Sequence, residues 1–222
     1  MRSSSSDNLI RTNLIFVDIH THKAKTQPGE IHVRNIVLSE AEAIFSRNEG
    51  GLFSLGVHPW SVENSDENDL EQLKIWISNK CVRLVGECGL DKFAKADYNL
   101  QESFFRKQIE ISEQFQKPMI IHCVGYFNEI FALKKEYKPL QKWVIHGFRS
   151  KPQLAEQALN QDIALSFGEH FNEESLKITP LDRLYIETDE SNMSITEIYS
   201  KIAQIRRCNE VDLCAGKSLL NC

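Results

Sequence analysis

Two histidines stand one residue apart in the stretch FVDIHTHK, residues 16–23. In a β-strand, side chains two positions apart point to the same face, so His20 and His22 project together. Imidazole is a common nitrogen ligand of zinc and similar ions, and the pair therefore forms half of a candidate metal site. The alternative is a pair of core histidines whose ring nitrogens bond to neighbouring polar groups. The apolar residues 14–17 that lead into the pair fit a strand buried on both faces.

Other groups able to bind metals lie at the ends of later apolar runs, namely Glu87, His122, His146 and Asp189. If the runs are parallel strands of one barrel, their carboxyl ends meet at a single mouth, where these groups converge with the first two histidines. Histidines and carboxylates arranged in this way bind a divalent ion and leave positions open for water. Glu87 comes from the middle of the set and is placed to bridge two ions about 3.5–4 Å apart. Taken singly, each histidine also fits a core role, and Asp189 also fits the N-cap of a turn.

Short runs of β-branched and aliphatic residues recur along the chain, and helix-like segments separate most of them. The predicted strands cover residues 14–22, 32–39, 52–59, 82–91, 118–124, 142–148, 163–170 and 183–189. The predicted helices cover residues 67–80, 100–117, 126–137, 152–161 and 195–208, the last of which closes the chain. This alternation predicts parallel βαβ units, and eight strands favour an α/β fold of the TIM-type (β/α)8 barrel class. Residues 23–31 leave no room for a helix, so we expect a lean barrel that lacks its first helix.

The composition is that of a globular chain. Apolar residues make up 41% of the 222 residues and charged residues 26%, which excludes an intrinsically disordered chain. The length fits one barrel domain over residues 1–222, with a flexible segment at residues 1–13. The net charge of −5 argues against non-specific attraction to nucleic acid, although a local basic groove is compatible with it.

The cysteine and hydrophobicity patterns indicate a cytoplasmic protein. The six cysteines show no C-x-x-C spacing, and several lie in apolar runs, as reduced thiols often do. Residues 1–13 contain no apolar signal-peptide core. No stretch approaches the roughly 20 apolar residues needed to span a membrane. We therefore expect a cytoplasmic location, no membrane partner, and a monomer as the favoured state.

The motifs DIHTH, GVHPW, GECGLD, QESFFRKQIEISEQFQKPMIIH, VIHGF and IETD occur in this order through nearly the whole chain. In order and content they resemble the TatD family of metal-dependent hydrolases, within the wider amidohydrolase-like barrels. The stretch from Gly86 to His122 is the most specific part of this resemblance.

The resemblance implies two divalent metal ions, with zinc, manganese, magnesium and iron all open. The implied ligands are His20, His22, Glu87 and Asp189 for the first ion, and Glu87, His122 and His146 for the second. The catalytic residues it implies are Asp189, which orients or deprotonates the attacking water, and the bridging Glu87. His58 matches a substrate-facing histidine of the family. The implied reaction is hydrolysis of a phosphodiester by metal-activated water, as in a deoxyribonuclease.

Several positions depart from the family pattern. The stretch HCVGYF after His122 lacks the arginine that the family usually carries there, and HGFRS replaces HCFSG, so Arg149 is a candidate to supply the lost charge. The loop after Asp189, DESNMSITEI, is neither proline-rich nor basic, which weakens the expected hold on a long nucleic acid. The remaining candidate phosphate contacts are Lys92, Arg149 and Lys151, each of which also fits an ordinary solvated surface charge.

Four further residues stand near the predicted mouth. Trp60 and Phe148 fit either stacking on a base or apolar packing of the rim. Glu169 and His170 end the seventh predicted strand, where the family has no ligand, so a position outside the site is the favoured interpretation.

Three functional hypotheses follow from this sequence. The leading one is a two-metal phosphodiesterase of the TatD type that acts on DNA or a smaller phosphodiester. A second keeps the metals and changes the bond to an ester, lactone or amide, because barrels of this kind host many chemistries. The third is a non-catalytic metal-binding scaffold for a partner. Retention of every ligand argues against the third, since structural stability alone needs fewer of them.

Overall fold

The computed structural model describes residues 15–24, 27–47 and 50–220, and the predicted flexible segment at residues 1–13 lies outside these ranges. Eight strands form one sheet in the order of the chain, and all neighbouring pairs are parallel. The strands are β1 (Phe16–Thr21), β2 (Glu30–Ile36), β3 (Leu52–Leu55), β4 (Val82–Asp91), β5 (Met119–Val124), β6 (Trp143–Ile145), β7 (Ile163–Phe167) and β8 (Leu184–Ile186).

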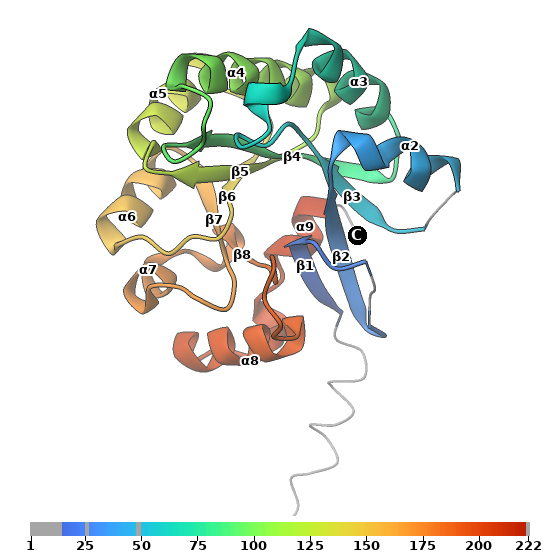
Figure 1. The fold of residues 1–222 in the computed structure, drawn as a ribbon. Helices are drawn as coiled ribbons and strands as arrows, with labels where there is room; N and C mark the ends of the chain where they lie inside the picture. The colour runs from blue at the N-terminus through green and yellow to red at the C-terminus, as the bar shows by residue number, and fades with distance from the viewer. Residues whose placement is uncertain (1–14, 25–26, 48–49, 221–222) are drawn as a thin grey trace, which may run out of the picture.

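The sheet curves round until its first and last strands meet. Thr21 and Asp189 form a parallel bridge between them. The backbone N–H of Asp189 donates to the His20 carbonyl at 2.9 Å, and the N–H of His22 donates to the Asp189 carbonyl at 3.3 Å. The strands therefore make a nearly closed barrel (Figure 1), which confirms the predicted TIM-type fold.

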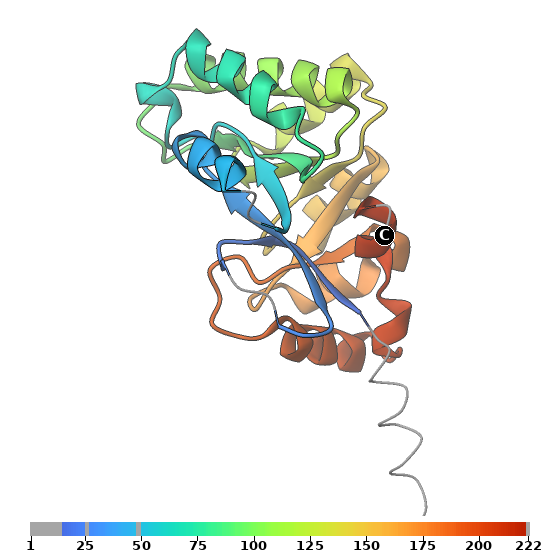
Figure 2. The ribbon, with the colours of Figure 1, turned by 90° about the vertical axis from the view of Figure 1, so that its right-hand side faces the viewer.

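Helices surround this barrel (Figure 1) and follow most strands in alternation. They are α2 (Leu38–Ser46), α3 (Glu67–Ile77), α4 (Tyr98–Phe115), α5 (Phe127–Tyr137), α6 (Pro152–Asn160), α7 (Glu173–Ile178), α8 (Ile195–Arg206) and α9 (Ala215–Leu220), with short 3₁₀ helices at Val62–Asn64, Leu181–Arg183 and Glu210–Asp212. The turned view in Figure 2 shows α3 and α4 on the opposite side of the barrel from α8. None of the helices in the described ranges is long and apolar enough to cross a lipid bilayer.

No helix lies between β1 and β2 in the described residues of that connection, as predicted for a barrel that lacks its first helix. Residues 22–24 and 27–29, the described part of the connection from β1 to β2, contain no helix. The predicted second strand at 32–39 is wrong at both ends, because β2 begins at Glu30 and ends at Ile36. The Glu40 carboxylate accepts the Val37 N–H at 3.2 Å, and this local bond starts α2 where strand was expected.

Two other helices, α7 and α9, were also missed. Each has six residues, which is too short to display a helical apolar pattern in the sequence. The expectation that a helix at 195–208 closes the chain is therefore wrong, since α9 follows α8.

The barrel interior is filled by apolar side chains from strands and from α9. They are Val17, Ile19, Val33, Leu84, Ile120, Val144, Ala164, Tyr185, Ala215, Leu219 and Leu220. Gly216 of α9 lies so close to β1 that an added Cβ would stand 2.8 Å from a Val17 methyl carbon. The Arg83 guanidinium, at the start of β4, donates to the Leu220 carbonyl. Helix α9 thus covers the end of the barrel where the strands begin, and the polar groups gather at the other end.

Candidate metal centre

The six predicted ligands lie together at the carboxyl ends of the strands. His20, Glu87 and His122 belong to β1, β4 and β5, whereas His22, His146 and Asp189 follow the ends of β1, β6 and β8. These residues form overlapping groups of three, to which His58 and Glu187 also belong. Within each group, one ring nitrogen or carboxylate oxygen per residue lies within 4.8 Å of the others. Groups from five strands therefore meet around the buried carboxylate of Glu87.

One side of Glu87 faces the residues at the ends of β1 and β8. Its Oε2 lies 3.5 Å from Nε2 of His20 and 4.0 Å from Nε2 of His22. Oδ1 of Asp189 lies 3.7 Å and 3.6 Å from the same two nitrogens. These distances are too long for good hydrogen bonds. The four potential ligand atoms, two carboxylate oxygens and two ring nitrogens, therefore surround a space.

His20 itself shows that this space suits an ion. Its side chain is fully buried, yet neither ring nitrogen has a hydrogen-bond partner. A buried polar group without a partner is costly unless something else binds it. Burial, followed by the charge of His146, lowers the pKa of His20 to about 4, so the ring is neutral and has a lone pair for a metal.

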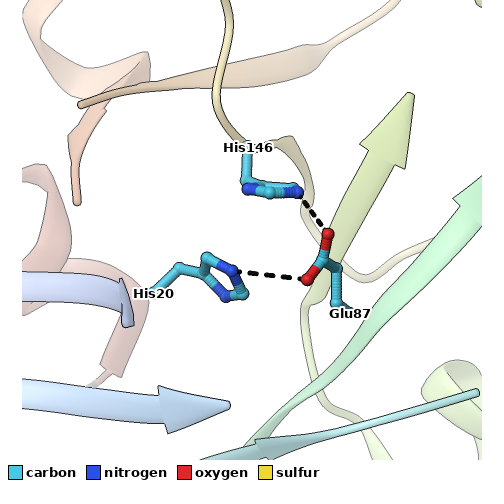
Figure 3. A group of neighbouring side chains, drawn as sticks. All are labelled: His20, Glu87 and His146. Carbon is cyan, nitrogen blue, oxygen red and sulfur yellow. Dashed lines mark ion pairs between the residues drawn. The ribbon is translucent and has the colours of Figure 1, made fainter. Parts of the chain in front are cut away.

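The other side of Glu87 is in direct contact with imidazoles. Its Oε1 lies 2.7 Å from Nε2 of His146, 2.8 Å from Nδ1 of His122 and 3.3 Å from Nε2 of His58. Figure 3 shows His20 and His146 facing different oxygens of the carboxylate. Burial raises the pKa of Glu87, but the charge of His146 and hydrogen bonds from the three imidazoles outweigh it and hold the pKa well below its usual value.

A second carboxylate stands behind each of the two close imidazoles. Nε2 of His122 lies 2.9 Å from Oδ2 of Asp91, and Nδ1 of His146 lies 3.4 Å from Oε1 of Glu187. Glu187 also accepts the Gly147 N–H at 2.6 Å. Carboxylates in this position orient an imidazole and fix which ring nitrogen faces the metal.

His58 is oriented differently from the other histidines of the cluster. Its Nδ1 accepts the backbone N–H of Trp60 at 3.1 Å, so in the neutral ring the proton resides on Nε2. That Nε2 points at Glu87 as a donor, which suits contact with a phosphate oxygen better than metal ligation. Val57, the residue before His58, is held by both polar atoms of the Gln108 side-chain amide. The Oε1 of Gln108 accepts the Val57 N–H at 2.7 Å, and its Nε2 donates to the Val57 carbonyl at 3.1 Å.

Asp18 connects the first strand to the segment that carries Asp189. Its carboxylate accepts the Thr188 N–H at 3.0 Å and the Thr188 hydroxyl at 2.6 Å. Burial raises the pKa of Asp18 to about 7. On the opposite side, Asn35 of β2 accepts the Glu87 N–H at 2.9 Å and the Ser54 hydroxyl at 3.0 Å. These bonds fix the backbone on both sides of the cluster.

Two cavities open beside the cluster, of about 390 and 280 Å³. Arg149 and Asp189 line both of them, and the substrate-binding role of Arg149 stays a prediction. Lys92 lies further round the mouth, where its backbone N–H donates to the Val124 carbonyl at 3.0 Å. Lys151 is exposed at the N-terminus of α6 and lines neither cavity.

The four other predicted mouth residues divide clearly. Phe148 is buried against Phe127 and Phe167, so it packs the rim, and it also lines the larger cavity. Trp60 is exposed. Glu169 and His170 line the smaller cavity but belong to none of the candidate metal groups among the described residues.

Sequence reasoning missed Asp91, Glu187 and Asn35. A signal was present for the first two, since Asp91 ends the fourth predicted strand and Glu187 stands two residues before Asp189. The two-residue spacing of Glu187 and Asp189 is the one that singled out His20 and His22, and it places the Glu187 and Asp189 carboxylates on one face. No pattern marks Asn35, whose role depends on the pairing of β2 with β3.

Proteins with similar sequences are named as metal-dependent hydrolases. A metal-dependent hydrolase of unassigned activity from Buchnera aphidicola is 31% identical over 156 residues, which cover 66% of this chain and 58% of the relative. YcfH of Escherichia coli K12, named in the same way, is 31% identical over 176 residues, or 75% of this chain and 62% of YcfH. The chain thus matches about three fifths of the length of these relatives.

The fold has a counterpart among solved structures. The crystal structure of YjjV, a TatD homologue from Escherichia coli K12, superposes with a TM-score of 0.81 at 19% identity, covering 93% of this chain and 98% of YjjV. The family model described as TatD related DNase matches residues 17–210. This chain therefore belongs to the TatD family of metal-dependent hydrolases.

Proposed function

We propose that this protein is a phosphodiesterase that hydrolyses DNA, with Glu87 bridging two divalent ions. The observation that carries the proposal is the division of ligands between the two oxygens of one carboxylate. Oε2 faces His20 and His22, whereas Oε1 faces His122 and His146. A carboxylate shared by two ligand groups is suited to hold two ions as close together as two-metal hydrolysis needs.

The proposed ligands of the first ion are His20, His22, Asp189 and Glu87, and those of the second are His122, His146 and Glu87, following the pair distances around the two oxygens of Glu87. Bound divalent ions acidify a water molecule and polarise a phosphoryl oxygen. The mixed set of imidazoles and carboxylates suits zinc, manganese or iron, and magnesium fits the carboxylates alone.

Asp189 is proposed to orient the attacking water and accept its proton. Burial, followed by the charge of Glu187, raises the pKa of Asp189 above its usual value, which makes this carboxylate a better base. Its side chain borders both mouth cavities, where substrate has access. His58 and Arg149 are proposed to donate to phosphate oxygens on either side of the cluster, with Lys92 as a further contact.

The same features support a cytoplasmic monomer. The five cysteines in the described ranges are unpaired, as expected of a reducing compartment. All proposed ligands come from one chain, so a second copy is not needed to complete the site.

The proposal is tested by measuring the metal content of the purified protein together with its hydrolysis of DNA and of bis(p-nitrophenyl) phosphate. We expect about two ions per chain and metal-dependent hydrolysis that Glu87→Ala and His122→Ala abolish. His32→Ala, which changes a β2 histidine outside the cluster, is the matched control and should keep the activity. Equal activity of Glu87→Ala and the parent would reject the assignment.

The alternatives are separated by the same preparation. The loop after Asp189 carries Glu190 and no basic residue up to Lys201, which favours a short substrate over a long polymer. Comparing dinucleotides with long DNA distinguishes these two phosphodiester classes. Activity on lactones, esters or acyl-amino acids without any on phosphodiesters would favour the second bond type, and bound metal without turnover would favour a scaffold.

A further inference from the structure

The rim of the mouth beside β3 and β4 carries two exposed aromatic side chains. Trp60 is 66% exposed and Phe93 is 76% exposed. Single exposed aromatic residues are common and have no meaning by themselves. This pair differs because both residues are hydrogen-bonded to the same buried carboxylate, Asp91.

The Trp60 ring is held in a fixed position in spite of its exposure. Its indole Nε1–H donates to Oδ2 of Asp91 at 2.8 Å, and its backbone N–H donates to Nδ1 of His58 at 3.1 Å. The His58 ring packs against the indole at 5.0 Å between centroids with an interplanar angle of 82°. An aromatic ring fixed in this way loses little side-chain entropy when a ligand covers it.

This ring is also adjacent to the metal centre. Its centroid lies 6.1 Å from that of the proposed ligand His122, and Asp91 bonds to both side chains through one oxygen atom. A planar group that covers Trp60 therefore lies next to a phosphate held at the cluster.

A cation completes this part of the rim. Lys92 places its Nζ 4.9 Å from the centroid of the Phe93 ring. Its aliphatic chain passes directly over Gly125, where φ is +80° and an added Cβ would overlap the lysine chain. The lysine chain thus runs across the end of β5, the strand that carries His122.

We propose that Trp60, with Phe93 and Lys92, forms a subsite for the nucleobase adjacent to the scissile phosphate. The inference rests on the proposed phosphodiesterase function, and it names the part of the substrate that this rim recognises. Aromatic faces stack on every base, so the subsite should be insensitive to base identity. The lysine supplies attraction for a flanking phosphate.

The test combines binding and hydrolysis. Thymidine 5′-phosphate should quench tryptophan fluorescence, whereas deoxyribose 5-phosphate, which lacks the base, should not. Trp60→Phe should remove the quenching and keep the binding, and Trp60→Ala should weaken binding by about tenfold, the order expected for one stacked base. Trp76→Phe is the matched control, because Trp76 of α3 packs against Phe45 of α2. This substitution should leave the quenching intact.

Hydrolysis gives the second readout. The KM of the dinucleotide dTpdT should be about tenfold lower than that of the analogue whose stacked base is removed, tested with an abasic site on each side in turn. Equal KM values for dTpdT and both analogues, together with quenching that does not depend on Trp60, would overturn the subsite while leaving phosphodiesterase activity measurable. Base-dependent quenching through Trp60 in a chain that hydrolyses no phosphodiester would support the subsite and reject the proposed function.

Discussion

The two sides of the Glu87 carboxylate differ in how closely the surrounding groups approach it. On the side of β1 and β8, the nitrogens of His20 and His22 stand 3.5 and 4.0 Å away. On the side of β5 and β6, the nitrogens of His122 and His146 stand 2.8 and 2.7 Å away, at hydrogen-bond distance. The first side surrounds a space, and the second is joined by direct bonds.

The supporting residues explain this difference. His20 has no hydrogen-bond partner at either nitrogen, and its lowered pKa keeps the ring neutral. Burial lowers the pKa of His146, but the charges of Glu87 and Glu187 outweigh it and hold that pKa well above its usual value. An ion on the first side therefore meets a neutral His20 ring, whereas an ion on the second side must displace a proton from His146. The two proposed ions should therefore bind with different affinity and different pH dependence.

The largest expected effect comes from removing one histidine on each side. His20→Ala and His146→Ala should each lose one ion, and hydrolysis should fall by about a thousandfold because an ion supplies several kcal/mol of transition-state stabilisation. The ion left in His146→Ala lies between His20, His22 and Asp189, on the side of Glu87 where no hydrogen bond between ligands has to be broken. In a chelator titration followed by metal analysis, this variant should keep its ion at chelator concentrations that strip His20→Ala.

His32→Ala serves as the control in the same titration, because this histidine lies outside the cluster. If His20→Ala kept its ion longer than His146→Ala, the side with direct hydrogen bonds would be the stronger site and the comparison would be reversed.

The next largest effect is on stability and pH in the metal-free protein. The pKa of His20 is about 4 in the folded chain and near 6.5 when unfolded, so between these values the unfolded chain binds more protons. As pH falls from 6.5 to 4, the parent should therefore lose up to about 3 kcal/mol of unfolding free energy relative to His20→Gln.

His146→Gln should show the opposite trend, which sharpens the comparison. Because the folded pKa of His146 is raised, its contribution is present below pH 6.5 and is lost as pH rises through the folded value. Urea unfolding at a series of pH values with a chelator present measures both differences. Parallel pH profiles for the parent and both variants would show that the two imidazoles do not differ in this way.

The fold and the clustering of the candidate ligands were predictable from the sequence because both depend on patterns along single strands. A chemically distinctive residue at the end of an apolar run reveals its place in a barrel, since parallel strands share one mouth. The six candidate ligands singled out in this way lie in one cluster in the structure, and metal binding by them stays a prediction. Strand ends were less predictable: β6 and β8 stop at Ile145 and Ile186, so His146 and Asp189 lie in the turns beyond them.

Asp91 and Glu187 have a positional signal in the sequence, but which imidazole each of them contacts was not predictable in the same way. Asp91 and His122 are joined only because β4 lies beside β5, and the pairing of Gly89 with His122 sets which carboxylate reaches the ring. Glu187, which follows β8, reaches His146, which follows β6, although β7 lies between these two strands. Such contacts depend on register and curvature, which leave no mark on either strand alone. The differences between the two sides of Glu87 therefore became visible only in three dimensions.

The smallest expected effect comes from these supporting carboxylates, and it should fall on one side of Glu87 only. Asp91→Asn removes the negative charge behind His122 and keeps the shape, as Glu187→Gln does behind His146. Loss of such a partner lowers metal affinity by about 10- to 100-fold. In the chelator titration, the ion proposed to bind His122 and His146 should leave each variant at a chelator concentration about 10- to 100-fold lower than in the parent. The ion proposed to bind His20 and His22 should leave at the same concentration as in the parent. Glu190→Gln, an exposed carboxylate at the same mouth, is the matched control. Equal weakening of both ions would mean that the carboxylates act on the whole cluster through Glu87, and the two sides would then be one electrostatic unit.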